Sequence, residues 1–168
     1  DLDADPVAVD ERLAADPALA PLVAQRPGLR SPGAVDGFEM AIRAVLGQQV
    51  SVAGGLTVAA ALAERCGVPL TIDDDEVTRL FPRADVIATL DPTELAIPQQ
   101  RARALVAVAA AVAEGRLDLA SGAAPERSRE ALLTIPGIGP WTADYVMMRA
   151  LGDPDVLASG DLVVRQQA

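Results

Sequence analysis

Histidine and lysine are absent from the 168 residues, and cysteine occurs only once, at Cys66. Without His the chain cannot form a Ser-His-Asp triad or a zinc site of Cys and His ligands, and a single Cys cannot form an internal disulfide. All 14 basic residues are Arg, which excludes a Schiff base formed by a lysine amine. Any acid–base chemistry must therefore use the carboxylates, of which there are 24.

Long apolar runs are also missing. No run reaches the roughly 18 uncharged residues that would cross a bilayer, and no basic region precedes a signal-like apolar stretch. The composition is 51% hydrophobic but only 2% aromatic, so Ala, Val and Leu must fill the core. We expect a cytoplasmic protein with no membrane partner.

The net charge of -10 counts against a nucleic-acid partner, because phosphate contacts dominate the affinity for such partners. The acids are unevenly distributed, however. Residues 1–20 carry five Asp and one Glu against a single Arg, and residues 72–76 add four acids. Since the last third is closer to balance, a local surface for an anion remains possible.

Apolar residues recur at helical spacing along most of the chain, and no strand is predicted. Asp36 and Glu39 have the spacing of a capping box, Ser51 is placed to cap the next helix, and residues 68–76 are predicted to form a loop. The expected helices are 10–15, 36–46, 51–66, 76–81, 84–90, 92–96, 99–114, 125–133 and 140–151, with a last one from residue 162.

Gly137-Ile138-Gly139 separates two of these helices, and Pro140 suits the first turn of the second. Closely spaced glycines permit positive φ and let a ligand approach the backbone. Free amides at a helix N-terminus form a natural anion site that needs no basic side chain. Spacing alone leaves open whether this turn binds a phosphate or is an ordinary corner.

The string Leu-Thr-Ile-Pro-Gly-Ile-Gly-Pro-Trp at 133–141 is more specific. Residues 133–149 resemble the helix-hairpin-helix of the base-excision DNA glycosylase superfamily, with the 3-methyladenine DNA glycosylase II family as the closest match. Residues 26–51 and 97–105 are similar to the same family, so the resemblance covers roughly residues 20–168.

The resemblance implies an all-α helix-hairpin-helix glycosylase core that lacks the family's N-terminal β domain and its C-terminal helices. Residues 1–30 are then an acidic segment leading into the core. Residues 31–168 are the glycosylase domain, truncated at its C-terminus. We expect this chain alone to be weakly active or inactive.

Asp161 follows the second hairpin helix and precedes an apolar stretch, so it lies where a helix should begin. It could be a simple N-cap, or an ionised carboxylate that stabilises an oxocarbenium-like sugar or activates water. The resemblance matches Asp161 to the family's catalytic aspartate. Asp153 and Asp155 are better explained as part of a solvated loop.

Trp141 and Tyr145 are four residues apart on one helical face and are the only Trp and Tyr. The residues alone leave core packing and base stacking equally open. The resemblance places both in the pocket for the extruded base. Bifunctional members carry a lysine at the position of Trp141, so the resemblance implies hydrolysis without strand cleavage.

Three further assignments depend on the resemblance or remain open. Gln48 and Gln49 match the region that fills the gap left by the extruded base, although the relative carries an apolar residue at Gln49, and a solvated or capping pair is the alternative. No cofactor is required, but Na+ or K+ could bind the backbone carbonyls of Leu133, Ile135 and Ile138. Arg101 and Arg103 could contact phosphate, but exposure to solvent is the simpler interpretation.

The sequence therefore predicts a monofunctional DNA glycosylase of the 3-methyladenine type that excises alkylated purines from damaged duplex DNA. We expect a monomer in the bacterial cytoplasm, associated with the nucleoid through its function. The alternatives are a non-catalytic helix-hairpin-helix DNA-binding module and an acidic helical interaction domain.

Overall fold

The computed structural model describes residues 5–71, 77–157, 160, 161 and 166. The chain divides into two units, Asp1–Gly33 and Ala34–Ala168. The division into an acidic segment at 1–30 and a glycosylase domain at 31–168 remains a prediction. Within the described residues, no helix is both long and apolar enough to cross a membrane.

The first unit contains two short helices, α1 (Pro6–Ala14) and α2 (Ala20–Gln25). Helix α1 begins earlier than the sequence predicts because the Asp5 carboxylate accepts the amides of Val7 and Ala8. Helix α2 was not predicted, since no side chain caps its start. Arg30 holds the unit together: its Nη2 donates to the Pro6 carbonyl at 2.9 Å and to Asp10 Oδ1 at 3.0 Å.

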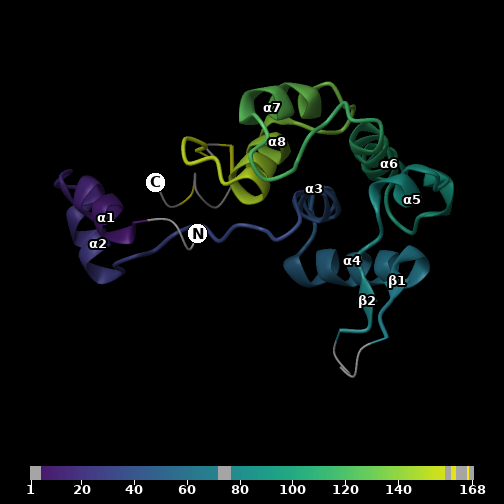
Figure 1. Cartoon of the computed structure of the whole chain (residues 1–168), viewed down its shortest axis with the longest axis horizontal. Helices are drawn as coiled ribbons and strands as arrows, with labels where there is room; N and C mark the ends of the chain where they lie inside the picture. The colour runs from purple at the N-terminus through teal and green to yellow at the C-terminus, as the bar shows by residue number, and fades with distance from the viewer. Residues whose placement is uncertain (1–4, 72–76, 158–159, 162–165, 167–168) are drawn as a thin grey trace. The chain divides into compact units, whose positions relative to one another are not determined.

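The second unit is built almost entirely from helices (Figure 1). They are α3 (Gly37–Leu46), α4 (Val52–Cys66), α5 (Ala84–Ala88), the 3-10 turn η1 (Pro92–Glu94), α6 (Gln99–Ala113), α7 (Pro125–Leu133), α8 (Pro140–Val146) and the π-helical turn η2 (Met147–Leu151). The predicted helices at 36–46, 51–66, 84–90, 99–114, 125–133 and 140–151 are thereby confirmed to within a few residues, the last ending in a π-helical turn. The predicted helix at 92–96 is only a 3-10 turn.

Helix α3 is the central element, packing against α4, α6, α8 and η2. Its start is fixed as the sequence predicts, because Asp36 Oδ1 accepts the Glu39 amide at 2.7 Å. Ile42, Val45 and Leu46 are at most 1% exposed, and Leu105 and Val108 of α6 are equally buried. Small Ala residues between them let the helices approach closely, so a core nearly free of aromatic residues can still pack densely.

The prediction of a helix at 76–81 is wrong. Residues 79 and 80 form a short strand, β2 (Arg79–Leu80), which pairs antiparallel with β1 (Val68–Pro69). Val77 and Leu80 are exposed, so a helix here would have no core face to bury. The chain also reverses tightly at Gly67, where a Cβ atom would lie only 2.4 Å from the carbonyl oxygens of Ala63 and Leu80. The predicted loop at 68–76 accordingly begins with a strand.

Most of the helix predicted from residue 162 onward lies outside the described residues, and Gln166, the one position of it that the structure describes, is helical.

Candidate nucleic-acid interface and active site

The hairpin lies between α7 and α8, at one end of the second unit (Figure 1). Ile135 and Ile138 are each 6% exposed and anchor the turn in the core. The Ile138 amide donates to the Ile135 carbonyl at 3.0 Å, which closes the turn. Behind the turn, Arg129 Nε donates to Asp144 Oδ1 at 2.7 Å and ties the two helices together. The two buried isoleucines and the Arg129–Asp144 ion pair thus hold the turn in place.

The two hairpin glycines have different roles. Gly137 has φ +93°, and a Cβ atom there would lie 3.0 Å from Ala104 Cβ of α6. Gly139 has φ −92°, and a Cβ atom there would meet nothing within 4 Å. Gly137 is therefore required by the fold, whereas Gly139 keeps the outer surface of the turn open.

The hairpin offers unpaired backbone donors. Within the described residues, no hydrogen-bond acceptor is found for the amides of Gly139, Trp141 and Thr142. The Ile138 amide, which the sequence grouped with the phosphate-binding atoms, is already used inside the turn. An anion at this turn would therefore meet the amides that follow Ile138 more readily than that of Ile138 itself.

Gln48 and Gln49, the pair predicted to fill the gap left by an extruded base, lie in the turn from α3 to α4. Their side chains have different surroundings. Gln48 Nε2 donates to the Gly137 carbonyl at 3.2 Å and to Thr142 Oγ1 at 2.9 Å. Thr142 is only 4% exposed, so this amide satisfies a buried hydroxyl. Gln48 connects the turn to the hairpin, a contact that nothing in the sequence pattern revealed.

Gln49 is exposed and has φ 56°, the only non-glycine residue with positive φ in the described part of the chain. A left-handed conformation costs an ordinary residue about 1–2 kcal/mol. Strain of this kind concentrates at functional sites. Of the two glutamines, Gln49 is the one whose side chain is presented to solvent.

Trp141 and Tyr145 stack on each other, with ring centroids 5.4 Å apart and planes 16° apart. The Arg149 guanidinium lies over the Tyr145 ring, 5.7 Å from its centroid. A base cannot insert between two rings that already stack. It would have to lie on an outer face of the pair, and Arg149 competes for the outer face of Tyr145.

Asp161 reaches the aromatic pair directly. Trp141 Nε1 donates to Asp161 Oδ2 at 2.9 Å, across 20 residues of sequence. The sequence indicated both residues, but as separate elements of a site, and gave no sign of this hydrogen bond. Asp153 behaves as expected for a loop residue, since its Oδ1 accepts the Asp155 amide at 3.0 Å.

Cys66, the single cysteine, is not part of this site. Its Sγ donates to the Leu62 carbonyl at 3.2 Å. Burial raises the pKa of the thiol, and the neighbouring Arg65 charge offsets this only in part. Since the thiolate is the reactive form, Cys66 is a structural residue.

A cavity of about 360 Å³ opens between the α3–α4 turn, the start of α6 and the hairpin. Gln48 and Gln49 line it from the first, Pro98, Gln100 and Arg101 from the second, and Gly137, Trp141 and Thr142 from the third. Three segments that are far apart in the sequence thus meet around one opening, and all three contain predicted site residues or their neighbours.

The chain is similar in sequence to known DNA repair proteins. Residues 1–36 match the family model described as AlkA N-terminal domain. The chain is 44% identical over its full length to the probable bifunctional transcriptional activator/DNA repair enzyme AlkA of Mycobacterium tuberculosis, and covers 34% of that protein. It is 40% identical over 153 residues to DNA-3-methyladenine glycosylase 2 of Escherichia coli, with 89% of this chain and 54% of that protein covered.

The fold agrees with solved structures. The 8-oxoguanine glycosylase/lyase of Clostridium acetobutylicum, in complex with double-stranded DNA, superposes with a TM-score of 0.77 at 21% identity, covering 99% of this chain and 58% of that one. This chain has the fold of a helix-hairpin-helix DNA glycosylase core. The resemblance to the 3-methyladenine DNA glycosylase II family is likewise confirmed. The chain spans between a third and about half of the length of these two curated relatives.

Proposed function

We propose that this chain is the core of a monofunctional glycosylase that excises alkylated purines from damaged duplex DNA. The observation that carries the proposal is the hydrogen bond from Trp141 to Asp161, which couples the carboxylate matched to the family's catalytic aspartate to the stacked pair Trp141 and Tyr145. The similar proteins of Escherichia coli and Mycobacterium tuberculosis, a DNA-3-methyladenine glycosylase and a probable DNA repair enzyme, support this proposal.

DNA would bind first through the hairpin. The amides of Gly139, Trp141 and Thr142 can donate to a backbone phosphate, and amide donors need no positive side chain. The net charge of -10 is therefore compatible with binding at this one surface. The open space at Gly139 lets the phosphate approach the backbone closely.

The damaged nucleotide would then leave the helical stack. An extruded base could lie on the outer face of Trp141, over which no guanidinium of the described residues lies. A positively charged alkylated purine stacks well on an electron-rich indole. Gln49, strained and exposed, is the residue that could fill the gap left in the duplex.

Asp161 would act on the sugar. As the N-glycosidic bond breaks, its electron pair leaves with the base and positive charge develops on the sugar ring. The Asp161 carboxylate can stabilise that charge and orient the water whose oxygen adds to the sugar carbon. The indole N–H of Trp141 would hold the carboxylate in place during this step.

Strand cleavage through a covalent amine intermediate is not expected. The lysine that would form a Schiff base in bifunctional members is replaced by Trp141, and the sequence contains no lysine. The product would be an abasic site in an intact strand. The same fold occurs in a glycosylase/lyase, so the fold itself does not distinguish the two activities. The proposal of hydrolysis without strand cleavage depends only on the absence of lysine.

A monovalent cation could assist the hairpin. Within the described residues, the carbonyls of Leu133 and Ile138 accept no hydrogen bond, whereas that of Ile135 accepts the Ile138 amide. A carbonyl has two lone pairs, so all three fit the hard oxygen donors that Na+ or K+ prefers. Such an ion would add positive charge next to the phosphate.

Two measurements separate this proposal from its alternatives. Salt-dependent binding to duplex DNA is expected, and its absence would favour an acidic helical interaction domain. Release of methylated purines under single-turnover conditions, with protein in excess so that slow chemistry is visible, is also expected. Binding without any release would point to a non-catalytic helix-hairpin-helix module.

A further inference from the structure

The cavity beside the hairpin differs in charge from four other cavities formed by the described residues. Among the described residues that line it there is no carboxylate, and Arg101 is the single charged side chain. Four other cavities in the second unit each include at least one acid, for example Asp36, Glu39, Glu94 or Glu130. Among these five cavities of the described residues, the opening next to Gly137 is therefore the best suited to an anion.

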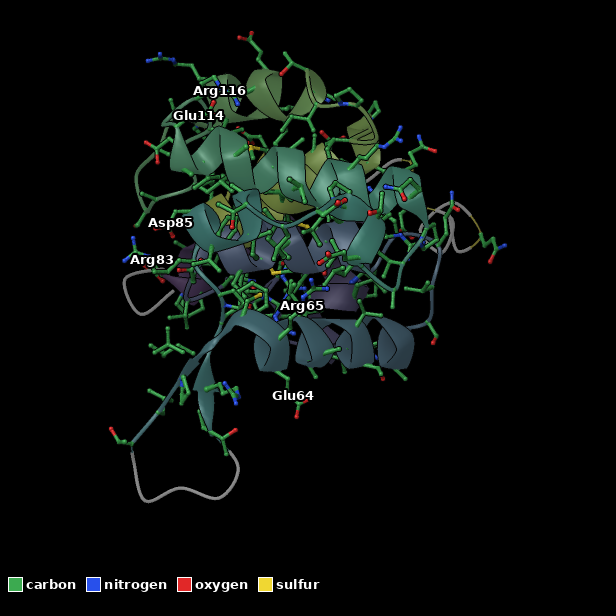
Figure 2. The ribbon with its side chains drawn as sticks, turned by 90° about the vertical axis from the view of Figure 1, so that its right-hand side faces the viewer. Glu64, Arg65, Arg83, Asp85, Glu114 and Arg116 are labelled. Carbon is green, nitrogen blue, oxygen red and sulfur yellow. The ribbon has the colours of Figure 1, made fainter. Side chains whose placement is uncertain are left out.

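Arg101 is also available to bind one. Five arginines of the second unit form ion pairs with carboxylates: Arg43, Arg65, Arg83, Arg116 and Arg129. Figure 2 shows two of these pairs at the surface, Arg83 beside Asp85 and Arg116 beside Glu114. Arg101 has no such carboxylate partner within the described residues, although it is half-buried.

Its surroundings supply neutral donors. Gln49 and Gln100 line the same cavity, and their side-chain amides can donate hydrogen bonds without adding charge. Gln48 is fixed by its bonds to Gly137 and Thr142, so this wall of the cavity is rigid. A guanidinium among glutamine amides is a favourable setting for the oxygens of a phosphodiester.

We propose that Arg101 binds a second DNA backbone phosphate in this cavity, beside the one held by the hairpin amides. This inference rests on the proposed DNA-binding function and adds a residue to it. In a chain of net charge -10, a cation that lines this cavity and has no carboxylate partner among the described residues would contribute much of the local attraction for DNA. Because it contacts the backbone, it would bind damaged and undamaged duplex alike.

Arg103 provides a matched control. It lies two residues further along α6 and therefore points to a different side of the helix. It is exposed, does not line the cavity and has no ion-pair partner among the described residues. Arg103→Gln removes the same charge from the same helix as Arg101→Gln, so general electrostatics affects both variants equally.

The test measures binding of the full 168-residue chain to a duplex containing a tetrahydrofuran abasic analogue at several salt concentrations. For Arg101→Gln we expect the slope of log affinity against log salt to become less steep by about one. For Arg103→Gln we expect the wild-type slope. Circular dichroism of both variants checks that the helices are retained.

Three outcomes would overturn the inference. Either Arg101→Gln keeps the wild-type slope, or both variants change it equally, or the wild-type chain does not bind duplex at all. The first two leave the proposed function intact if Gly139→Ala still weakens binding, because that variant tests the hairpin alone. The third contradicts the proposed function as well.

Discussion

The indole N–H of Trp141 donates a hydrogen bond of 2.9 Å to Asp161 Oδ2, and the Trp141 ring stacks on Tyr145. Trp141 thus contacts both Tyr145 and Asp161, the carboxylate that the resemblance matches to the family's catalytic aspartate. In the proposed function the indole has two separable roles: its ring would hold a base, and its N–H would orient the carboxylate. Substitutions can remove these functions one at a time.

Trp141→Phe keeps an aromatic ring but removes the N–H. A hydrogen bond to a charged group contributes about 1.5–3 kcal/mol, so we expect single-turnover excision to slow by about one to two orders of magnitude. Binding to an abasic duplex should change little, because the hairpin amides remain. The measurement is the excision rate and the duplex affinity of the same preparation.

Tyr145→Phe is the matched control for that variant. It keeps the ring stacked on Trp141 and leaves the bond to Asp161 untouched, removing only a hydroxyl that accepts a hydrogen bond from Arg149 Nη1 at 3.4 Å. Its excision rate should stay within a few-fold of wild type. Equal loss in both variants would argue against a separate role for the indole N–H.

Gln48→Leu should destabilise the second unit. The substitution leaves the Gly137 carbonyl and the buried Thr142 hydroxyl without their shared donor, which costs about 1–3 kcal/mol. The measurement is the free energy of unfolding in urea. Gln49→Leu changes the neighbouring exposed residue and should stay within about 0.5 kcal/mol of wild type. A neutral Gln48→Leu would mean that the turn and the hairpin are held together by other contacts.

The two hairpin glycines should respond differently to alanine. Gly137→Ala forces a side chain into φ +93° against Ala104, and we expect a loss of about 1–2 kcal/mol in stability. Gly139→Ala places a methyl group in open space, so stability should be unchanged while duplex binding weakens several-fold. Urea unfolding and duplex-binding curves of both variants check this. If Gly139→Ala binds duplex DNA like wild type, the phosphate does not bind at this side of the turn.

Stability of the first unit should depend on pH through Asp10. The Gly28 amide and then the Arg30 side chain hold the pKa of Asp10 below its usual value of 3.8. Stabilisation of this kind is present above the unfolded-state pKa and is lost as the pH falls through the folded-state value. We expect the protection factor of the Gly28 amide against hydrogen exchange to fall as the pH drops below about 4. In Asp10→Asn, exchange should already be fast at pH 6, and a wild-type rate in that variant would contradict the assignment.

Most helices of the second unit could be predicted because their signals are local. Asp36 and Ser51 cap their helices as their spacing indicates, with carboxylate or hydroxyl oxygens accepting the amides of Glu39 and Gly54. The strand at Arg79–Leu80 could not be predicted in this way. Its conformation depends on pairing with Val68–Pro69 and on the close approach at Gly67, which are contacts between segments rather than local preferences.

The same distinction applies to the site. Residue types and a resemblance indicated Trp141, Tyr145 and Asp161 individually, but the hydrogen bond that joins Trp141 to Asp161 spans 20 residues and has no sequence signal. The different environments of Gln48 and Gln49 depend on the positions of Gly137 and Thr142, which lie 89 and 94 residues after Gln48. Arg101 looked like an ordinary solvated arginine until the fold placed it beside the hairpin.

The most direct test of the proposed chemistry is Asp161→Asn, which keeps the size of the side chain and removes its charge. Release of 7-methylguanine and 3-methyladenine from methylated duplex DNA should be measured under single-turnover conditions for both proteins, alongside their affinity for an abasic duplex. We predict that the variant binds the duplex like wild type and releases these bases at least about 100-fold more slowly, as for loss of a major charge-stabilising group. Release at the wild-type rate by Asp161→Asn would contradict the assignment of this carboxylate to catalysis.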